Sequence, residues 1–160
     1  MSSLKQRRAS IIFSASTLYD QDTFYRAFMR DLLHSKDEVI IESPFITEKR
    51  MRTLPPIFAK LRSRNVRIVI NTRNPNEHDG DYYYQALKAI YELQALGVTV
   101  LYTAGHHRKL AILDRKVVYE GSLNILSFND SCEIMRKIAS EKAAKQLCTF
   151  IAIDRYARIK

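Results

Sequence analysis

Hydrophobic and polar positions repeat along the chain with two different periods, and the period changes several times. Apolar residues that recur every three to four positions predict amphipathic helices, whereas short apolar runs between turn residues predict strands. The predicted strands cover residues 11–16, 38–45, 66–71, 98–102, 109–114, 117–122 and 132–138. The predicted helices cover residues 20–35, 47–64, 81–96 and a closing segment from about residue 140. Strands that alternate with helices in this way predict an α/β fold.

Single residues mark where several of these elements should begin and end. Asp20 is expected to cap the first helix, and the proline pair at 55–56 predicts a kink or a restart in the second. Asn65 is expected to end the second helix in the left-handed conformation, and Gly97 is expected to end the third. Residues 73–81 have the densest turn composition of the chain, which predicts an exposed loop that could form a lip for a substrate.

The size and composition are those of one soluble globular domain. The chain has 160 residues, of which 46% are hydrophobic and 27% charged. We treat residues 1–160 as a single domain, with residues 1–8 as a flexible basic N-terminal segment. Because no apolar run approaches the roughly 20 residues of a membrane span, and no secretory signal is recognisable, we expect a cytoplasmic protein without a membrane anchor.

The two cysteines do not predict a bridge or a metal site. Cys132 and Cys148 have no C-x-x-C spacing and lie in apolar surroundings, so both are expected to be reduced and packed. No metal and no cofactor are predicted.

The charge balance favours a polyanionic partner. The chain has 26 basic and 17 acidic residues, which gives a formal net charge of +9. Such a surface suits nucleic acid or an acidic membrane, although charge alone does not distinguish these partners from a merely soluble basic surface.

The most informative pattern is H-x-K-x4-D-x6-G-S, which is written here as HRKLAILDRKVVYEGS. Its specified positions are His107, Lys109, Asp114, Gly121 and Ser122. Attack on a phosphodiester requires a nucleophile such as histidine, a fixed cation and a rim of small polar groups, and this pattern supplies all three. Each residue alone has an ordinary structural interpretation, but the set at this spacing predicts a phosphodiesterase site.

Spacing also predicts how these side chains lie. His107 and Lys109 are two residues apart, so on an extended segment they face the same side and can meet one phosphate. Ser122 and Asn124 have the same spacing and are expected to line the same opening and donate hydrogen bonds to phosphate oxygens. Asp114 would point to the opposite face, which indicates a supporting role away from the phosphate.

Attack by an imidazole requires an acceptor that holds its second ring nitrogen. Glu133, at the start of the strand after the Gly-Ser loop, is the candidate; the alternative is a solvated glutamate at a strand end. His106 is expected to pack or to bind substrate, and Arg108 to face the opposite side; neither is given a catalytic role. His78 is interpreted as a polar loop residue.

A second H-x-K triplet, His34-Ser35-Lys36, does not continue the pattern. The position that should hold aspartate is Ile41, no Gly-Ser follows, and the triplet lies at a predicted helix end. A basic helix terminus, stabilised by the helix dipole, explains it better. The chain therefore carries one motif.

With these residues the sequence resembles the phospholipase D superfamily, whose signature is the same pattern, and in particular its single-motif bacterial endonucleases. The resemblance implies a mixed sheet flanked by helices, and a metal-independent phosphodiesterase that forms a phosphohistidine. It implies His107, Lys109 and Glu133 as catalytic residues, with Lys109, Ser122 and Asn124 on the phosphate. Because two motifs form one site in this superfamily, the chain is expected to form a homodimer in which one His107 attacks and the other protonates the leaving oxygen.

Three functions remain open at this point. The basic charge favours a nuclease that cuts DNA or RNA. A phospholipid phosphodiesterase is the alternative, although no amphipathic anchor for a lipid interface is apparent. The third possibility is a non-catalytic domain for nucleic-acid binding or dimerisation within a larger nucleic-acid-processing protein, against which the intact motif argues.

Overall fold

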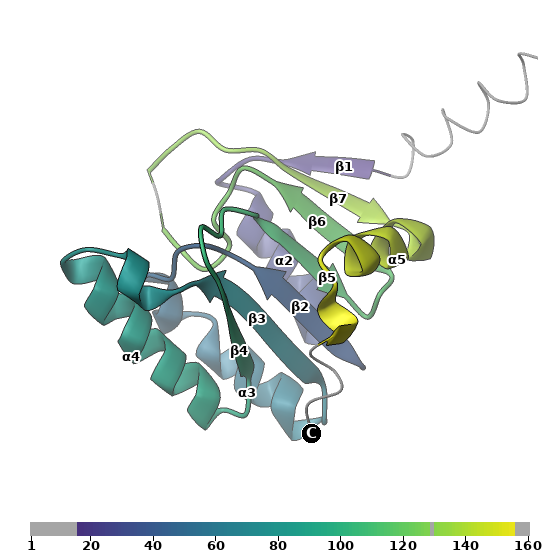
Figure 1. The fold of residues 1–160 in the computed structure, drawn as a ribbon. Helices are drawn as coiled ribbons and strands as arrows, with labels where there is room; N and C mark the ends of the chain where they lie inside the picture. The colour runs from purple at the N-terminus through teal and green to yellow at the C-terminus, as the bar shows by residue number, and fades with distance from the viewer. Residues whose placement is uncertain (1–15, 129, 156–160) are drawn as a thin grey trace, which may run out of the picture.

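The computed structural model describes residues 16–128 and 130–155, which form a seven-stranded mixed sheet with helices on both faces (Figure 1). The strands are β1 (Ser16–Tyr19), β2 (Glu38–Glu42), β3 (Arg67–Arg73), β4 (Thr99–Thr103), β5 (Leu110–Leu113), β6 (Val117–Gly121) and β7 (Met135–Ala139). The α-helices are α2 (Phe24–His34), α3 (Pro55–Ser63), α4 (Asp81–Ala95) and α5 (Glu141–Phe150). Short 3-10 helices are η1 (Arg50–Arg52), η2 (Pro75–Glu77) and η3 (Ile153–Arg155). The predicted α/β class and the mixed sheet are confirmed.

The sheet has the strand order β1-β7-β6-β5-β2-β3-β4. Strands β2, β3 and β4 are parallel and are joined through α3 and α4, whereas β5, β6, β7 and β1 are added antiparallel. All residues of β2 and β5 are buried, since these central strands are covered on both faces. This explains why their sequences read as nearly continuous apolar runs.

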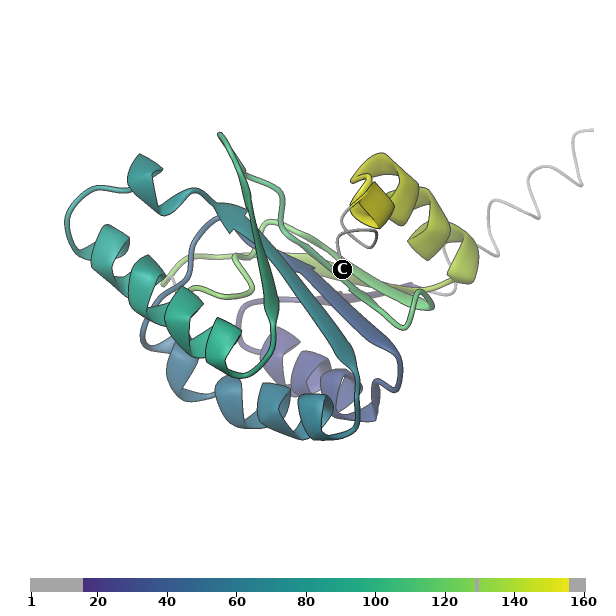
Figure 2. The same cartoon turned by 60° about the horizontal axis from the view of Figure 1, so that its bottom comes forward.

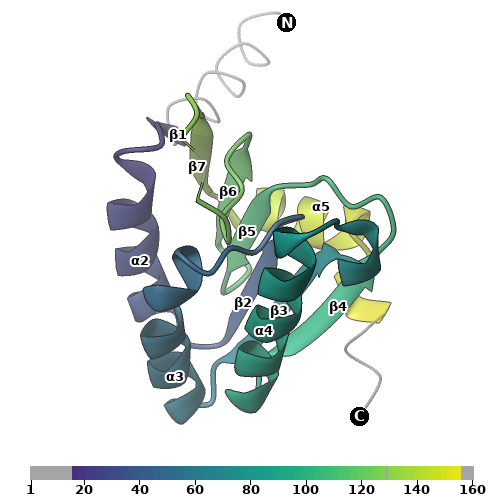
Figure 3. The same ribbon diagram turned by 90° about the vertical axis from the view of Figure 1, so that its left-hand side faces the viewer.

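The helices divide into two unequal layers. Helices α2, α3 and α4 lie side by side on one face, and α5 lies on the other (Figures 2 and 3). The larger apolar core lies under α2 to α4, where Phe24, Phe28 and Tyr119 pack with ring centroids 5.0–5.5 Å apart. The smaller core lies under α5 and includes Ile112, Val118 and Cys148. Because α5 covers only part of this face of the sheet, the ends of β5, β6 and β7 beside the helix are left uncovered.

Several boundaries differ from the prediction for local reasons. Asp20 does not cap α2, which begins at Phe24; its carboxylate instead accepts two backbone N–H groups in the preceding turn. β2 ends at Glu42 rather than at residue 45. Thr47 does not open a helix either, because η1 is a single turn and α3 begins afresh at Pro55, where the first helical turn tolerates proline. The segments 1–8 and 11–15 lie outside the described residues.

The loop predicted over residues 73–81 is not fully exposed, which corrects that expectation. It contains η2, and both Pro75 and His78 are buried. The His78 ring lies 5.1 Å from that of Phe45, and burial lowers its pKa. The helix that follows begins at Asp81.

The helix ends predicted at Asn65 and Gly97 are confirmed, and both residues are left-handed. Asn65 has φ 62° after α3, and Gly97 has φ 79° after α4. Ser140 caps α5, since its hydroxyl accepts the Ala143 N–H at 3.2 Å.

Both cysteines are free, but only one is packed. Cys148 lies on the buried face of α5, whereas Cys132 is exposed, so the prediction of a packed thiol was wrong for Cys132. Within the described residues, no helix has the length and apolar character needed to cross a membrane.

Candidate active site

The irregular segment between β4 and β5 brings the two basic residues of the motif together. Lys109 Nζ lies 3.2 Å from His107 Nδ1 and donates a hydrogen bond of 2.7 Å to the His107 carbonyl oxygen. The His107 side chain is exposed and Lys109 is half-buried. Burial lowers the pKa of Lys109, and the nearby Glu133 carboxylate opposes that shift. An imidazole and an ammonium group therefore face the same space.

That space is a wide cavity of about 750 Å³ on the α5 side of the sheet. It is formed where β5 begins and β6 ends, with the end of α5 as one wall. Its lining residues are Leu18, His107, Arg108, Lys109, Leu110, Glu120, Gly121, Ser122, Ile134, Arg136, Leu147 and Phe150. We call it the motif cavity. It collects every specified position of the motif except Asp114.

The Gly-Ser pair lies where the backbones of β6 and β7 approach closely. A Cβ atom on Gly121 would lie 2.0 Å from the Ile134 carbonyl oxygen, so only glycine fits. Ser122 donates its N–H to the same oxygen at 2.9 Å, and its hydroxyl accepts the Ile134 N–H at 3.0 Å. The close approach fixes the hydroxyl at the cavity wall.

Glu133 is held beside Ser122 rather than on His107. Ser122 Oγ donates to one carboxylate oxygen of Glu133, and Ser131 Oγ donates to the other at 2.6 Å. The Glu133 N–H donates to Gln21 Oε1 at 3.0 Å. Among the described residues of this one chain, no hydrogen bond joins Glu133 to His107. The structure thus places the predicted acceptor at the site without the predicted bond.

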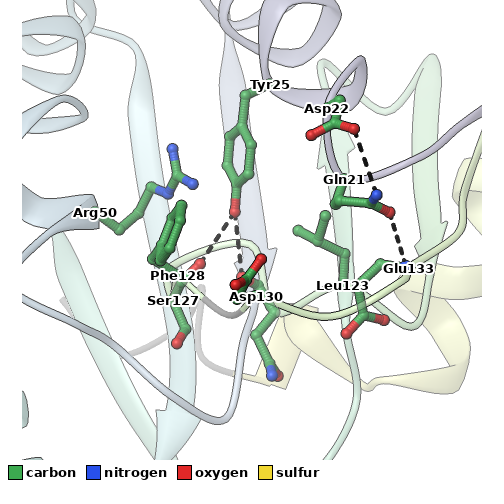
Figure 4. A pocket seen from close by; sticks show the side chains of 10 residues that line it. Gln21, Asp22, Tyr25, Arg50, Leu123, Ser127, Phe128, Asp130 and Glu133 are labelled. Carbon is green, nitrogen blue, oxygen red and sulfur yellow. Dashed lines mark hydrogen bonds between the residues drawn. The ribbon is translucent and has the colours of Figure 1, made fainter.

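Asn124 does not line the motif cavity. Since β6 ends at Gly121, the strand alternation that predicted a shared opening with Ser122 does not reach residue 124. Asn124 instead lines a smaller neighbouring cavity of about 80 Å³, and its Oδ1 is buried without a hydrogen-bond partner in the described chain. Figure 4 shows this second cavity, with Tyr25 and Glu133 at its walls. Burial raises the pKa of Tyr25 to about 12.

Asp114 lies in the turn between β5 and β6, away from both cavities. Its carboxylate accepts the backbone N–H groups of Lys36, Asp37 and Glu38 at 2.9, 2.8 and 2.9 Å. Asp114 and Arg115 both have φ 51°, a conformation that aspartate tolerates. The residue ties the hairpin that carries the motif to the start of β2, which is a supporting position.

We expect Asp114→Ala to lower the free energy of unfolding by about 2–3 kcal/mol, because three N–H groups lose their acceptor. Asp114→Asn keeps one acceptor oxygen and should lose less. Urea denaturation of both variants measures the difference. An unfolding midpoint of Asp114→Ala equal to that of the unchanged protein would contradict this role.

An ion pair between a buried glutamate and the partly exposed Arg108 anchors the motif segment, and sequence analysis missed it. Glu42 is fully buried at the end of β2, and Arg108 donates to its two carboxylate oxygens at 2.5 and 2.9 Å. Asn71 also donates to Glu42, at 3.1 Å. Arg108 lines the motif cavity as well, so the prediction that it faces the opposite side is only partly correct. The signal available in the sequence was Glu42 itself, a charged residue at the end of the apolar run EVIIE.

The surroundings of His106 and His34 indicate structural roles for both residues. His106 is buried, with 2% exposed, and burial lowers its pKa. His34 ends α2, and its Nδ1 lies 2.7 Å from the Arg30 carbonyl oxygen, as a helix-end residue should. Over residues 16–128 and 130–155, no three side chains of histidine, cysteine, aspartate or glutamate gather where they could hold a metal ion.

Comparison with known families identifies the class of protein. Residues 28–152 match the family described as "Cardiolipin synthase, PLD-like domain". The match covers most of the chain, and the protein therefore belongs to this phospholipase D-like family. No curated protein is similar enough in sequence to count as a match.

Solved structures share the fold at low sequence identity. Nuc, a phospholipase D family member from Salmonella typhimurium, superposes with a TM-score of 0.70 at 16% identity, covering 89% of this chain and 94% of Nuc. NucT from Helicobacter pylori gives a TM-score of 0.64 at 16% identity, with 84% and 91% covered. Phosphatidylserine synthase from Haemophilus influenzae gives 0.61 at 14% identity, covering 90% of this chain and 38% of that one. These likenesses establish the phospholipase D-like fold.

Proposed function

We propose that the protein is a metal-independent nuclease, which hydrolyses DNA or RNA phosphodiesters through a phosphohistidine at a homodimer interface. The observation that carries this proposal is the motif cavity, in which an exposed His107, Lys109 and the Ser122 hydroxyl face one space. A nucleophile, a cation and a hydrogen-bond donor around one opening suit attack on phosphorus.

The reaction takes two displacements. The His107 imidazole of one protomer attacks phosphorus, so that an N–P bond forms while the P–O bond to the leaving oxygen breaks. The same histidine of the second protomer donates its proton to that oxygen. It then takes a proton from water, which attacks phosphorus, breaks the N–P bond and regenerates the imidazole. Lys109 and Ser122 hold the negative charge on the phosphoryl oxygens in both steps.

Glu133 is proposed as the acceptor that orients the attacking imidazole. Its carboxylate already influences Lys109, so it lies within electrostatic reach of the reacting groups. Ser122 and Ser131 now occupy its two oxygens through rotatable hydroxyls, which can turn toward phosphate instead. Asn124 is proposed to contact phosphate only after its loop adjusts, because it now faces the smaller cavity.

We propose that a second copy of the chain covers the cavity. Leu18, Ile134 and Phe150 surround it with 53%, 52% and 74% of their surfaces exposed. Apolar side chains gathered around one opening mark an interaction surface. A twofold contact there would bring two His107 residues to one phosphate, as a chain with one motif requires.

The apolar wall of the cavity also favours a second candidate, a phospholipid phosphodiesterase. Leu147 and Phe150 of α5 could contact an acyl chain next to the phosphate. The net charge of +9 suits a long polyanion better, which is why we place the nuclease first.

Cleavage assays in excess EDTA test the proposal. We expect the purified protein to cut single-stranded DNA, duplex DNA or RNA in EDTA and to sediment as a dimer. Phosphatidyl vesicles incubated in parallel test the lipid alternative. Turnover of the vesicles with no cut in any nucleic acid would replace the nuclease by the lipid enzyme, and activity lost in EDTA would contradict the metal-independent mechanism.

A further inference from the structure

One cation of the motif cavity lies outside the motif itself. Arg136 lies in β7, is half-buried and lines the cavity together with His107 and Lys109. Its guanidinium donates a hydrogen bond of 2.8 Å from Nη1 to Ser16 Oγ. Glu120 stands opposite Arg136 in the strand register, yet within the described chain neither Glu120 nor another carboxylate forms an ion pair with it.

Four other half-buried arginines, Arg67, Arg73, Arg108 and Arg115, each have a carboxylate within 2.5–3.6 Å. Two more have internal partners of other kinds, since Arg50 lies over the Tyr25 ring and Arg62 donates to the Val66 carbonyl oxygen. A partly desolvated charge without a counter-ion costs free energy, and such a group in a cavity suits an anionic ligand. Arg136 is therefore placed to receive an anion from outside the chain.

The position of Arg136 relative to the motif suggests which anion. The Gly121 N–H reaches the Lys109 carbonyl oxygen at 3.4 Å, and Gly121 pairs with Met135 in β7. Lys109 and β7 are thus separated by two strand spacings, which is about 10 Å between backbones. Lys109 and Arg136 both have long side chains and enter one cavity from backbones at this separation. They can therefore hold two neighbouring phosphates rather than one.

We propose that Arg136 binds a second phosphate of the nucleic acid, adjacent to the phosphate that His107 attacks. The proposal rests on the proposed function. It makes the cavity selective for a chain with consecutive phosphates over a molecule with a single phosphodiester. Arg136 is on this account a specificity-determining residue, and it does not take part in bond breaking.

The test compares two substrates in Arg136→Gln. The first is an oligonucleotide that the unchanged protein cleaves, and the second is methyl p-nitrophenyl phosphate, which has one phosphodiester and no second phosphate. We expect kcat/KM on the oligonucleotide to fall about tenfold or more, mainly through KM, with less than about a twofold change on the small diester. The slope of log KM against log salt should shrink by about 1.

Arg26→Gln is the matched control, since Arg26 is exposed on α2, on the opposite face of the sheet. It removes the same charge and should leave both substrates unchanged. Equal losses on both substrates, or dissociation of the Arg136→Gln dimer during sedimentation, would assign Arg136 to the reacting phosphate or to the dimer contact and overturn the proposal. Unchanged oligonucleotide kinetics would overturn it as well.

Failure of the proposed function gives a different result. If the unchanged protein turned over methyl p-nitrophenyl phosphate but cut no nucleic acid, the phosphodiesterase would stand, and both the nuclease and the second-phosphate site would fall. If it turned over neither substrate, the proposed function itself would be wrong, whatever the variant did.

Discussion

Replacing His107 by alanine is expected to lower phosphodiester cleavage by about a thousandfold or more, with fold and dimer retained. The imidazole is the proposed nucleophile in one protomer and the proton donor in the other, so one substitution removes both roles from a twofold site. Its side chain is exposed, and its only hydrogen bonds in the described chain are to Lys109, so little stability should be lost. Single-turnover cleavage of a labelled oligonucleotide in EDTA measures the effect.

The chain supplies its own control for this variant. His34 begins the second H-x-K triplet, ends α2 and lies outside both cavities. His34→Ala should cleave at the rate of the unchanged protein. If the His107→Ala protein kept a tenth of the activity, His107 would not be the nucleophile.

Replacing Lys109 by alanine is expected to have the second largest effect. Removal of a main contact to the developing negative charge costs about 2–4 kcal/mol, which corresponds to a rate loss of about 30- to 900-fold. Because that charge is greatest in the transition state, kcat should carry most of the loss. Steady-state kinetics on methyl p-nitrophenyl phosphate isolate this contact from the rest of a nucleic acid.

Lys36→Ala is the control for Lys109, since Lys36 holds the same place in the second triplet and is exposed. We expect it to have unchanged kinetics. The assignment of Lys109 would be lost if its alanine variant kept a rate close to that of the unchanged protein.

The fold was predictable because its signals are local. The buried runs of β2 and β5, the left-handed stops at Asn65 and Gly97, and the change of apolar period are all readable within a few residues. The starts of helices were less predictable. Asp20 resembles a helix cap in sequence, yet it stabilises the turn before α2, because a short polar side chain can serve either arrangement.

The placement of the motif residues was predictable where they flank β5. His107 and Lys109 meet as the two-residue spacing predicts, and Asp114 lies away from the cavity. Asn124 was misplaced because the alternation of β6 ends three residues before it.

The contacts of the motif with the rest of the chain join residues that are far apart in the sequence, so no local pattern predicts them. The pair between Glu42 and Arg108 joins residues 66 positions apart, and the place of Arg136 in the cavity follows from the register of β6 with β7. The bond between Ser122 and Glu133 likewise depends on how the loop before β7 folds back. Tertiary structure was needed for each of these.

The central claim is that two copies of the chain contribute one His107 each to a single reaction. It is tested most directly by mixing the unchanged protein with His107→Ala under conditions of subunit exchange, at constant total protein. Because a mixed dimer lacks one of the two imidazoles, activity should fall as the square of the unchanged fraction, to about one quarter in an equal mixture. A linear fall, to about one half, would mean that each chain acts alone and would contradict the claim.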